Sequence, residues 1–131
     1  MINLKYPLIL ASNSPRRQQL LREAGFEFTI RTLSVNEDFP KSMKVVEVPA
    51  YLARKKAEGL LFLSMENIIL SADTIVVCND RILGKPESPQ EAFEMLTLLS
   101  GKSHRVYTGV CLAFKNQCKT IVEETEVKFN D

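Results

Sequence analysis

The chain has 131 residues, of which 45% are hydrophobic and 25% charged, a composition that is typical of one globular domain and excludes a disordered chain. Its 17 Lys and Arg nearly balance its 16 Asp and Glu, and the net charge of +1 excludes the strongly basic surface of most nucleic-acid-binding proteins. No apolar run is long enough to span a membrane, and the three cysteines include no Cys-x-x-Cys pair, so we expect a cytoplasmic protein with free thiols and with neither nucleic acid nor membrane as a partner.

The N-terminal part predicts a strand that leads directly into a helix. Residues 8–12 form a short apolar run, as in a buried strand. Ser14 is suited to cap a helix that begins with Pro15, and Gly25 is suited to end it. We expect the apolar residues of this helix to face the core: Leu20, Leu21 and Ala24.

The middle of the chain predicts a second strand, a second helix and a central strand. Apolar and polar residues alternate over 26–30, which is the period of a strand. A loop over 34–44 precedes a helix that we expect over 49–63, with its cationic residues outside. Residues 67–78 are mostly apolar and are bounded by turn residues, which is typical of a central strand.

The last third predicts a short strand, a helix and a long antiparallel hairpin. A tight turn at 79–80 leads into a strand over 81–83, and a capping box at 88–91 opens a helix that ends at Gly101. We expect this helix to bury four apolar residues: Ala92, Phe93, Leu96 and Leu99. Residues 104–130 alternate with period two around a turn at 115–117.

This order of elements predicts an α/β fold, a mixed twisted sheet flanked by helices, in one domain over 1–131. The last predicted strand has no element after it, so we expect it to form an edge of the sheet. We also expect the natural fold unit to be longer than this chain, which would then be incomplete at its C-terminus.

The turn at residues 12–17 is the first candidate site. A strand leads into a helix N-terminus, whose free N–H groups favour an anion. Arg16 and Arg17 lie in that first turn, where each cation is unfavourable by roughly 0.3–1 kcal/mol against the helix dipole. A bound phosphate chain would explain the pair, but so would salt bridges with surface carboxylates or plain solvation, and local chemistry does not separate these alternatives.

Asp73 is the second candidate, because it interrupts the most apolar strand of the chain. A carboxylate there needs a partner, a metal ion or an open strand end. It could bind a metal or act as a base, or it could accept a hydrogen bond from a neighbouring backbone N–H. The adjacent polar Thr74 favours the first interpretation.

Three further charged residues carry weaker signals. Lys85 lies between Gly84 and Pro86, in a bend that would present a cation to phosphate. Glu37 is an acid in a predicted loop, and Lys56 lies on a helix rich in cations. Solvation is the simplest expectation for both Glu37 and Lys56.

Taken together, these segments resemble the Maf-like (septum formation inhibitor) proteins. The resemblance rests on an ordered set of motifs: LASNSPRRQQLL at 10–21, Glu37, LARKKA at 52–57, SADTIVV at 71–77, GKP at 84–86 and LSGKSHRVYTGV at 99–110. It implies a two-lobed structure around a long twisted mixed sheet, with a nucleotide between the lobes. It also implies a nucleoside triphosphate pyrophosphatase that uses a divalent cation, Mg²⁺ or Mn²⁺.

The resemblance also implies a role for each candidate residue. Ser12, Arg16 and Arg17 would bind the phosphates, with Lys56 and Lys85. Glu37 and Asp73 would bind the metal ion or act as the general base, and Lys85 would also assist catalysis. The intact Ser-Pro-Arg-Arg and Ala-Asp-Thr motifs are similar to those of the branch that cleaves dTTP and UTP.

The sequence leaves three functions open. The first is hydrolysis of dTTP or UTP, or of modified nucleotides, to the monophosphate and pyrophosphate. The second is nucleotide binding by a catalytically impaired fragment that lacks a C-terminal Asp-Lys-Ala-Gly segment of the family. The third is an interaction protein in septum formation and cell division. A homodimer is compatible with each of them.

Overall fold

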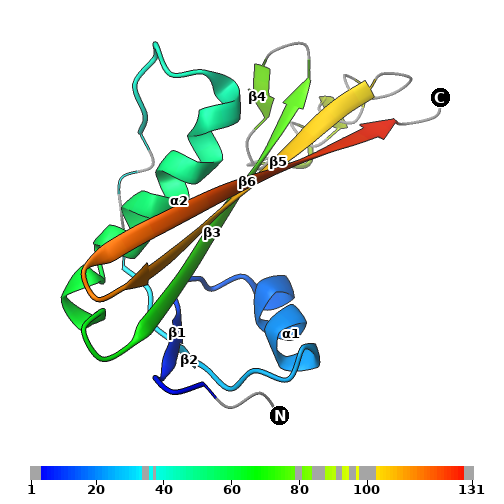
Figure 1. The fold of residues 1–131 in the computed structure, drawn as a ribbon. Helices are drawn as coiled ribbons and strands as arrows, with labels where there is room; N and C mark the ends of the chain where they lie inside the picture. Colours follow the sequence, from blue (N-terminus) through cyan, green and yellow to red (C-terminus); the bar gives the residue numbers. More distant parts are fainter. Residues whose placement is uncertain are drawn as a thin grey trace.

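The described part of the chain forms one mixed β-sheet with helices beside it (Figure 1). This computed structural model describes residues 4–33, 36, 38–78, 81–83, 88–90, 93–94, 97 and 103–128. The strands are β1 Leu8–Leu10, β2 Thr29–Ile30, β3 Ile68–Cys78, β4 Arg81–Leu83, β5 Ser103–Phe114 and β6 Gln117–Lys128. The helices are α1 Pro15–Glu23 and α2 Val48–Glu58, and the 3-10 turns are η1 Val45–Glu47 and η2 Leu61–Leu63.

The strand order is β2-β1-β3-β5-β6, and β4 pairs with β3 beside this path. β1 is parallel to both of its neighbours, whereas β3 with β4, β3 with β5 and β5 with β6 are antiparallel. The α/β class and the mixed sheet predicted from the sequence are therefore confirmed. β6 lies at an edge of the sheet, also as predicted.

Local chemistry explains both ends of α1. The Ser14 side chain accepts a hydrogen bond from the backbone N–H of Arg17 at 3.4 Å, and Pro15 occupies the first turn. At the other end, Gly25 has a φ of 91°, and the N–H groups of Gly25 and Phe26 donate to Arg22 and Leu21. This is a Schellman motif, in which glycine accepts the left-handed conformation without strain.

The predicted inner face of α1 is wrong. No residue of the helix is buried, and Leu20 is 50% exposed. The helix joins strands β1 and β2 at one end of the sheet, away from α2 (Figure 1). The described residues therefore form no core against it, and its apolar side chains remain accessible.

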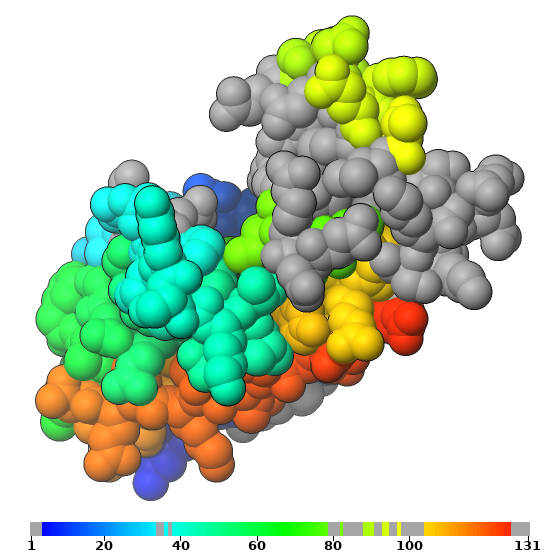
Figure 2. Space-filling view, turned by 90° about the horizontal axis from the view of Figure 1, so that it is seen from above, coloured from blue at the N-terminus to red at the C-terminus, as the bar shows by residue number. Residues whose placement is uncertain are grey.

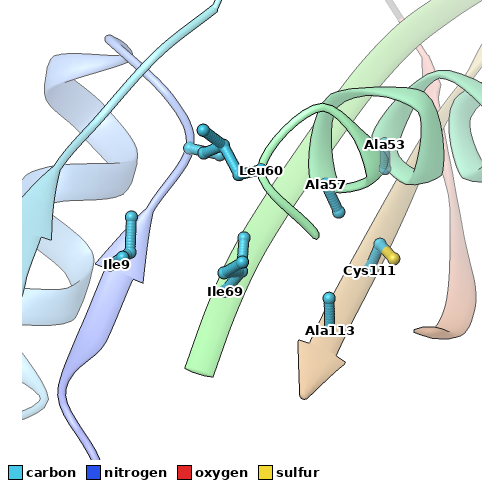
Figure 3. Close-up of a cluster of buried hydrophobic side chains, with 8 residues drawn as sticks. Ile9, Ala53, Ala57, Leu60, Ile69, Cys111 and Ala113 are labelled. Atoms are coloured by element: carbon cyan, nitrogen blue, oxygen red, sulfur yellow. The ribbon is translucent and has the colours of Figure 1, made fainter. Parts of the chain in front are cut away.

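Helix α2 covers one face of β3 and β5. Ala53 and Ala57 are fully buried, and their small side chains let the helix pack closely on Ile69 and Cys111 (Figure 3). A second cluster lies toward the other end of α2: Val48, Leu52, Ile75, Val77 and Tyr107. Each fully buried Leu or Ile contributes about 1.5–3 kcal/mol, so these clusters hold the helix on the sheet.

Gly109 of β5 permits the closest approach between α2 and the sheet. A Cβ atom at this position would overlap the backbone of Pro49 and Ala50, at the start of the helix. Only glycine therefore fits beneath the first turn of α2.

The hairpin of β5 and β6 has two different faces. Its turn residues, Lys115 and Asn116, have φ values of 47° and 63°, as in a type I′ turn. Cys111 faces α2 and is fully buried, and burial raises the pKa of its thiol to about 12. Leu112 and Ile121, on the opposite face, are 46% and 65% exposed. Seen from above, β6 lies beside α2 and the segment before it (Figure 2).

Several predicted boundaries need correction. The helix expected over 49–63 ends at Glu58, because Gly59 follows and a 3-10 turn replaces the last turn. The strand expected over 26–30 is reduced to β2.

Part of the predicted third helix can also be compared with the structure. Residues 89–90, 93–94 and 97 are helical, but Phe93, which we expected to be buried, is 68% exposed. Ala92, Leu96, Leu99 and Gly101 lie outside the described residues. No described helix is long and apolar enough to cross a membrane.

Candidate functional site

The candidate site lies at an interrupted edge of β3. β1 pairs with residues 68–70 of this strand, and β4 pairs with residues 76–78 of it. Between them, no described strand pairs with residues 71–75 on this edge, although β5 pairs along the other edge. In α/β sheets, ligands bind beyond strand ends where neighbouring connections diverge. Here β1 ends, and Asp73 and Thr74 lie on β3 beside its end.

Ser12 directly follows β1 and joins this edge to α1. Its hydroxyl accepts a hydrogen bond from the Ser14 backbone N–H at 3.1 Å and a longer one from Arg17 Nη1 at 3.5 Å. Ser12 is buried, so these contacts hold the turn in one conformation before the helix begins. The turn and the Arg17 side chain are thereby linked.

Arg17 reaches from α1 to the sheet. Its Nη2 donates to Thr74 Oγ1 at 2.9 Å, and Thr74 Oγ1 lies 3.1 Å from Thr108 Oγ1 on β5. A guanidinium group has five N–H donors, and these protein contacts occupy two of them. The remaining donors can bind a phosphate oxygen.

Lys56 and Asp73 form an ion pair on the other face of β3. The distance from Nζ to Oδ1 is 3.0 Å, and the two side chains are 22% and 15% exposed. Successive residues of a strand point to opposite faces, so Asp73 points toward α2 while Thr74 points toward Arg17. Lys56 is thus the partner that a carboxylate within an apolar strand requires. We had expected Lys56 to be simply solvated, and this expectation was wrong.

A buried hydrogen bond holds α2 in register with this pair. The Ser71 hydroxyl donates to the backbone carbonyl of Ala53. Lys56 follows Ala53 by about one helical turn, and Asp73 follows Ser71 by two strand positions on the same face. The bond therefore fixes the height at which Lys56 meets Asp73.

A pocket of about 170 Å³ opens beside the turn that follows β1. It is lined by Ala11, Ser12, Asn13, Thr32, Leu33 and Lys56. Ser12, which bonds to Arg17, therefore shares this pocket with Lys56. A larger open depression of about 750 Å³ lies outside β1 and β2, beside the end of α1, and contains none of the predicted site residues.

The structure brings together four of the predicted site residues: Ser12, Arg17, Lys56 and Asp73. Arg16 lies exposed on the same first turn of α1. Glu37 and Lys85 fall outside the described residues.

Thr108 was not predicted as a site residue from the sequence. Its hydroxyl meets Thr74 because the two residues are paired in the antiparallel register of β3 and β5. The predicted hairpin placed Thr108 on a strand, but it did not show which residue of β3 lies opposite. That register is set by contacts between segments far apart in the chain. Thr32, which lines the pocket, was missed because it is brought there by contacts between distant segments, whereas Asn13 belongs to the predicted turn but was not named as a site residue.

A comparison with models of protein families matches the sequence of the chain to a known group of proteins. The model of the Maf-like protein family matches residues 7–131. The chain belongs to this family. The resemblance inferred from its sequence motifs is thus confirmed.

Two curated relatives of the chain share one name. A dTTP/UTP pyrophosphatase of Bacteroides thetaiotaomicron is 42% identical over 128 residues, which are 96% of this chain and 66% of that protein. A dTTP/UTP pyrophosphatase of Halalkalibacterium halodurans is 49% identical over 123 residues, which are 94% of this chain and 65% of that protein. The chain thus spans slightly less than two thirds of the length of these relatives.

Solved structures support the fold. The Ham1 protein of Staphylococcus aureus superposes with a TM-score of 0.65 at 11% identity, covering 93% of this chain and 71% of that one. A HAM1 protein from Coxiella burnetii superposes with a TM-score of 0.51 at 15% identity, covering 94% and 72%. At such low identities the likeness concerns the fold alone.

The described residues of this Maf-like chain could hold a divalent cation only together with a substrate. Asp73 provides a carboxylate, but no group of three or more His, Cys, Asp or Glu side chains converges within the described part of the chain. Mg²⁺ is commonly bound by one or two carboxylates plus the phosphates of a nucleotide. Asp73 fits that arrangement, with the phosphates providing further oxygen ligands.

Proposed function

We propose that the protein hydrolyses dTTP and UTP to the nucleoside monophosphate and pyrophosphate. The observation that carries the proposal is a pair of cations that both meet Ser12: Arg17 bonds to it, and Lys56 shares a pocket with it and pairs with the carboxylate of Asp73. Such a site offers charge complementarity to a triphosphate and one group able to bind a metal ion or a proton. The name of the two curated relatives, dTTP/UTP pyrophosphatase, supports the choice of substrate.

The reaction needs position and charge neutralisation more than covalent chemistry. Water attacks the α-phosphorus, the bond from the α-phosphorus to the bridging oxygen breaks, and pyrophosphate leaves. Arg17 and Lys56 would bind the phosphate oxygens on which negative charge increases, and Ser12 would orient the turn that carries Arg17. Arg16, in the same first turn, and Lys85 complete the proposed set of cations.

Asp73 has two possible tasks in this reaction. It could accept a proton from the attacking water, or it could bind the cation that accompanies the nucleotide. A bound Mg²⁺ or Mn²⁺ would neutralise phosphate charge and orient the triphosphate. Glu37 is the second candidate for both tasks. We propose that one of these two carboxylates binds the cation and that the other accepts the proton.

The same proposal includes the setting in which the enzyme works. We propose a cytoplasmic enzyme whose partner is its nucleotide substrate, without nucleic acid or membrane, and which can form a homodimer. The near-neutral net charge of +1 supports the absence of a nucleic-acid partner.

Product analysis tests the proposal. The chain is incubated with Mg²⁺ or Mn²⁺ and with dTTP, UTP, dCTP and GTP in separate reactions, and the nucleotide and phosphate products are quantified. We expect the monophosphate and pyrophosphate in equal amounts, with dTTP and UTP preferred. A diphosphate with inorganic phosphate, or no turnover at all, would contradict the proposal. Thermal stabilisation by dTTP without turnover would instead indicate a nucleotide-binding protein.

A further inference from the structure

We propose that Thr108 is a positioning residue, which holds the Arg17 guanidinium in place through the hydroxyl of Thr74. The inference rests on the proposed function, because the series from Thr108 through Thr74 to Arg17 is given the task of preparing Arg17 to bind a triphosphate. Thr108 is linked to the guanidinium group of Arg17 through the hydroxyl of Thr74, which bonds to both residues.

The geometry consists of two hydrogen bonds in series. Arg17 Nη2 donates to Thr74 Oγ1 at 2.9 Å, and Thr74 Oγ1 lies 3.1 Å from Thr108 Oγ1. Thr74 and Thr108 are direct partners in the register between β3 and β5, so their side chains share one face of the sheet. The hydroxyl pair therefore has a rigid base on two adjacent strands.

Charge determines the favoured direction of the hydrogen bonds. Arg17 is always protonated and can only donate, so Thr74 Oγ1 accepts from it. A hydroxyl that donates its own hydrogen onward is a better acceptor, because neighbouring hydrogen bonds polarise one another. We therefore assign the hydrogen of Thr74 to Thr108 Oγ1, which strengthens the bond from Arg17.

This arrangement gives the half-buried Arg17 side chain a defined orientation. Arg17 bonds to Ser12 at 3.5 Å, a long distance for a hydrogen bond, whereas its bond to Thr74 is short. An arginine side chain loses much rotamer freedom when it binds a ligand. Fixing the guanidinium beforehand lowers that cost and so increases the affinity for a phosphate.

The first test measures Arg17 in the free protein. Relaxation of its ¹⁵Nε–H group by NMR reports the order of the side chain without any nucleotide. We expect Thr108→Val to lower this order, because valine keeps the branched shape and removes the hydroxyl. Thr108→Ser, which keeps a hydroxyl, restores it. Unchanged order in Thr108→Val would overturn the inference.

A matched control separates this effect from a general loss of threonine. Thr125 of β6 lies on the same face of the sheet, since it pairs with Val106, two residues before Thr108. Thr125→Val therefore removes a hydroxyl from the same surface but outside the Arg17–Thr74–Thr108 series. The Arg17 order is expected to be unchanged in this variant, and an equal loss in both variants would contradict the inference.

The second test measures binding of inorganic tripolyphosphate by calorimetry. We expect Thr108→Val to weaken binding by about three- to tenfold, the range for one hydrogen bond. The effect should disappear in an Arg17→Ala background, as a double-mutant cycle requires when one residue acts through another. An effect of equal size in that background would overturn the inference. Loss of Arg17 order in Thr108→Val, in a chain that binds no triphosphate, would contradict the proposed function alone.

Discussion

The ion pair between Lys56 and Asp73 explains how a carboxylate can occupy the middle of an apolar strand. Both side chains are largely shielded from water, so each charge needs the other. Such a pair also suits a site in which charges must be redistributed when a ligand binds. A phosphate could bind Lys56 while Asp73 turns to a cation or to water.

Asp73→Asn should abolish turnover while the fold survives. Asparagine is nearly isosteric with aspartate, but it is neither a proton acceptor nor a good ligand for a hard cation. We expect pyrophosphate release to fall at least about a hundredfold, the lower range for loss of a general base. The unfolding temperature, measured in parallel, shows whether the variant is folded. A folded variant with near-normal turnover would make Asp73 a structural residue.

Arginine substitutions should separate the two ends of α1. Arg17→Ala is expected to weaken dTTP binding by about 1.5–3 kcal/mol, the range for hydrogen bonds to charged groups, and Arg16→Ala should also weaken it. Arg22→Ala, on the last turn of the same helix, is the control and should leave the affinity unchanged. Calorimetric titration with dTTP checks all three. Equal affinities of the Arg17 and Arg22 variants would contradict the role of Arg17.

Among the elements, those defined by local patterns were predicted best. The apolar run of β3, the alternation in the hairpin and the capping signals of α1 lie within short stretches of sequence. The exposed face of α1 could not be predicted, because burial depends on which elements pack against a helix. The partner of Lys56 was missed for a similar reason. It depends on the position of α2 over β3, and on the buried bond from Ser71 to Ala53.

Gly109→Ala should loosen the contact between α2 and the sheet. The added methyl group overlaps the backbone of Pro49 and Ala50, which cannot rotate away as a side chain could. We expect a loss of about 1–3 kcal/mol or more in the free energy of unfolding, the usual range for overpacking. Gly59→Ala is the control, because its methyl group would press only on the flexible end of Leu33 and would meet the backbone oxygens of Lys55 and Lys56 at ordinary van der Waals distances. Urea denaturation compares them, and equal stabilities would contradict this account.

At the scale of the whole molecule, the two faces of the sheet differ in how far other elements pack against them. Helix α2 covers one face, while Leu112 and Ile121 lie exposed on the other face of the hairpin. β6 is also an edge strand of 12 residues, so its outer backbone groups can pair with another chain. Several of its charged residues oppose such pairing in part, among them Lys119, Glu123, Glu124 and Glu126.

Ile121→Lys should reduce self-association. The substitution replaces an exposed apolar side chain on an edge strand with a charge, which is a common protection of such edges. We expect the apparent mass from light scattering to rise with concentration in the unaltered chain and to rise less in the variant. Thr125→Lys adds the same charge to the same face of β6 without removing an apolar group. An equal effect of both variants would show that net charge, and not Ile121, controls association.

The interrupted edge of β3 should also determine the rates at which the backbone amides of this strand exchange their hydrogens with water. Ile68 and Leu70 use their backbone groups to bond toward β1, so the alternation of a strand directs the N–H groups of Ala72 and Thr74 to the same edge. Those of Ser71, Asp73 and Ile75 point to β5. We therefore expect fast and slow amides to alternate along a single strand. Bound dTTP should slow the hydrogen exchange of Ala72 and Thr74 selectively. Before the nucleotide binds, neighbouring amides such as those of Asp73 and Thr74 would therefore exchange at very different rates.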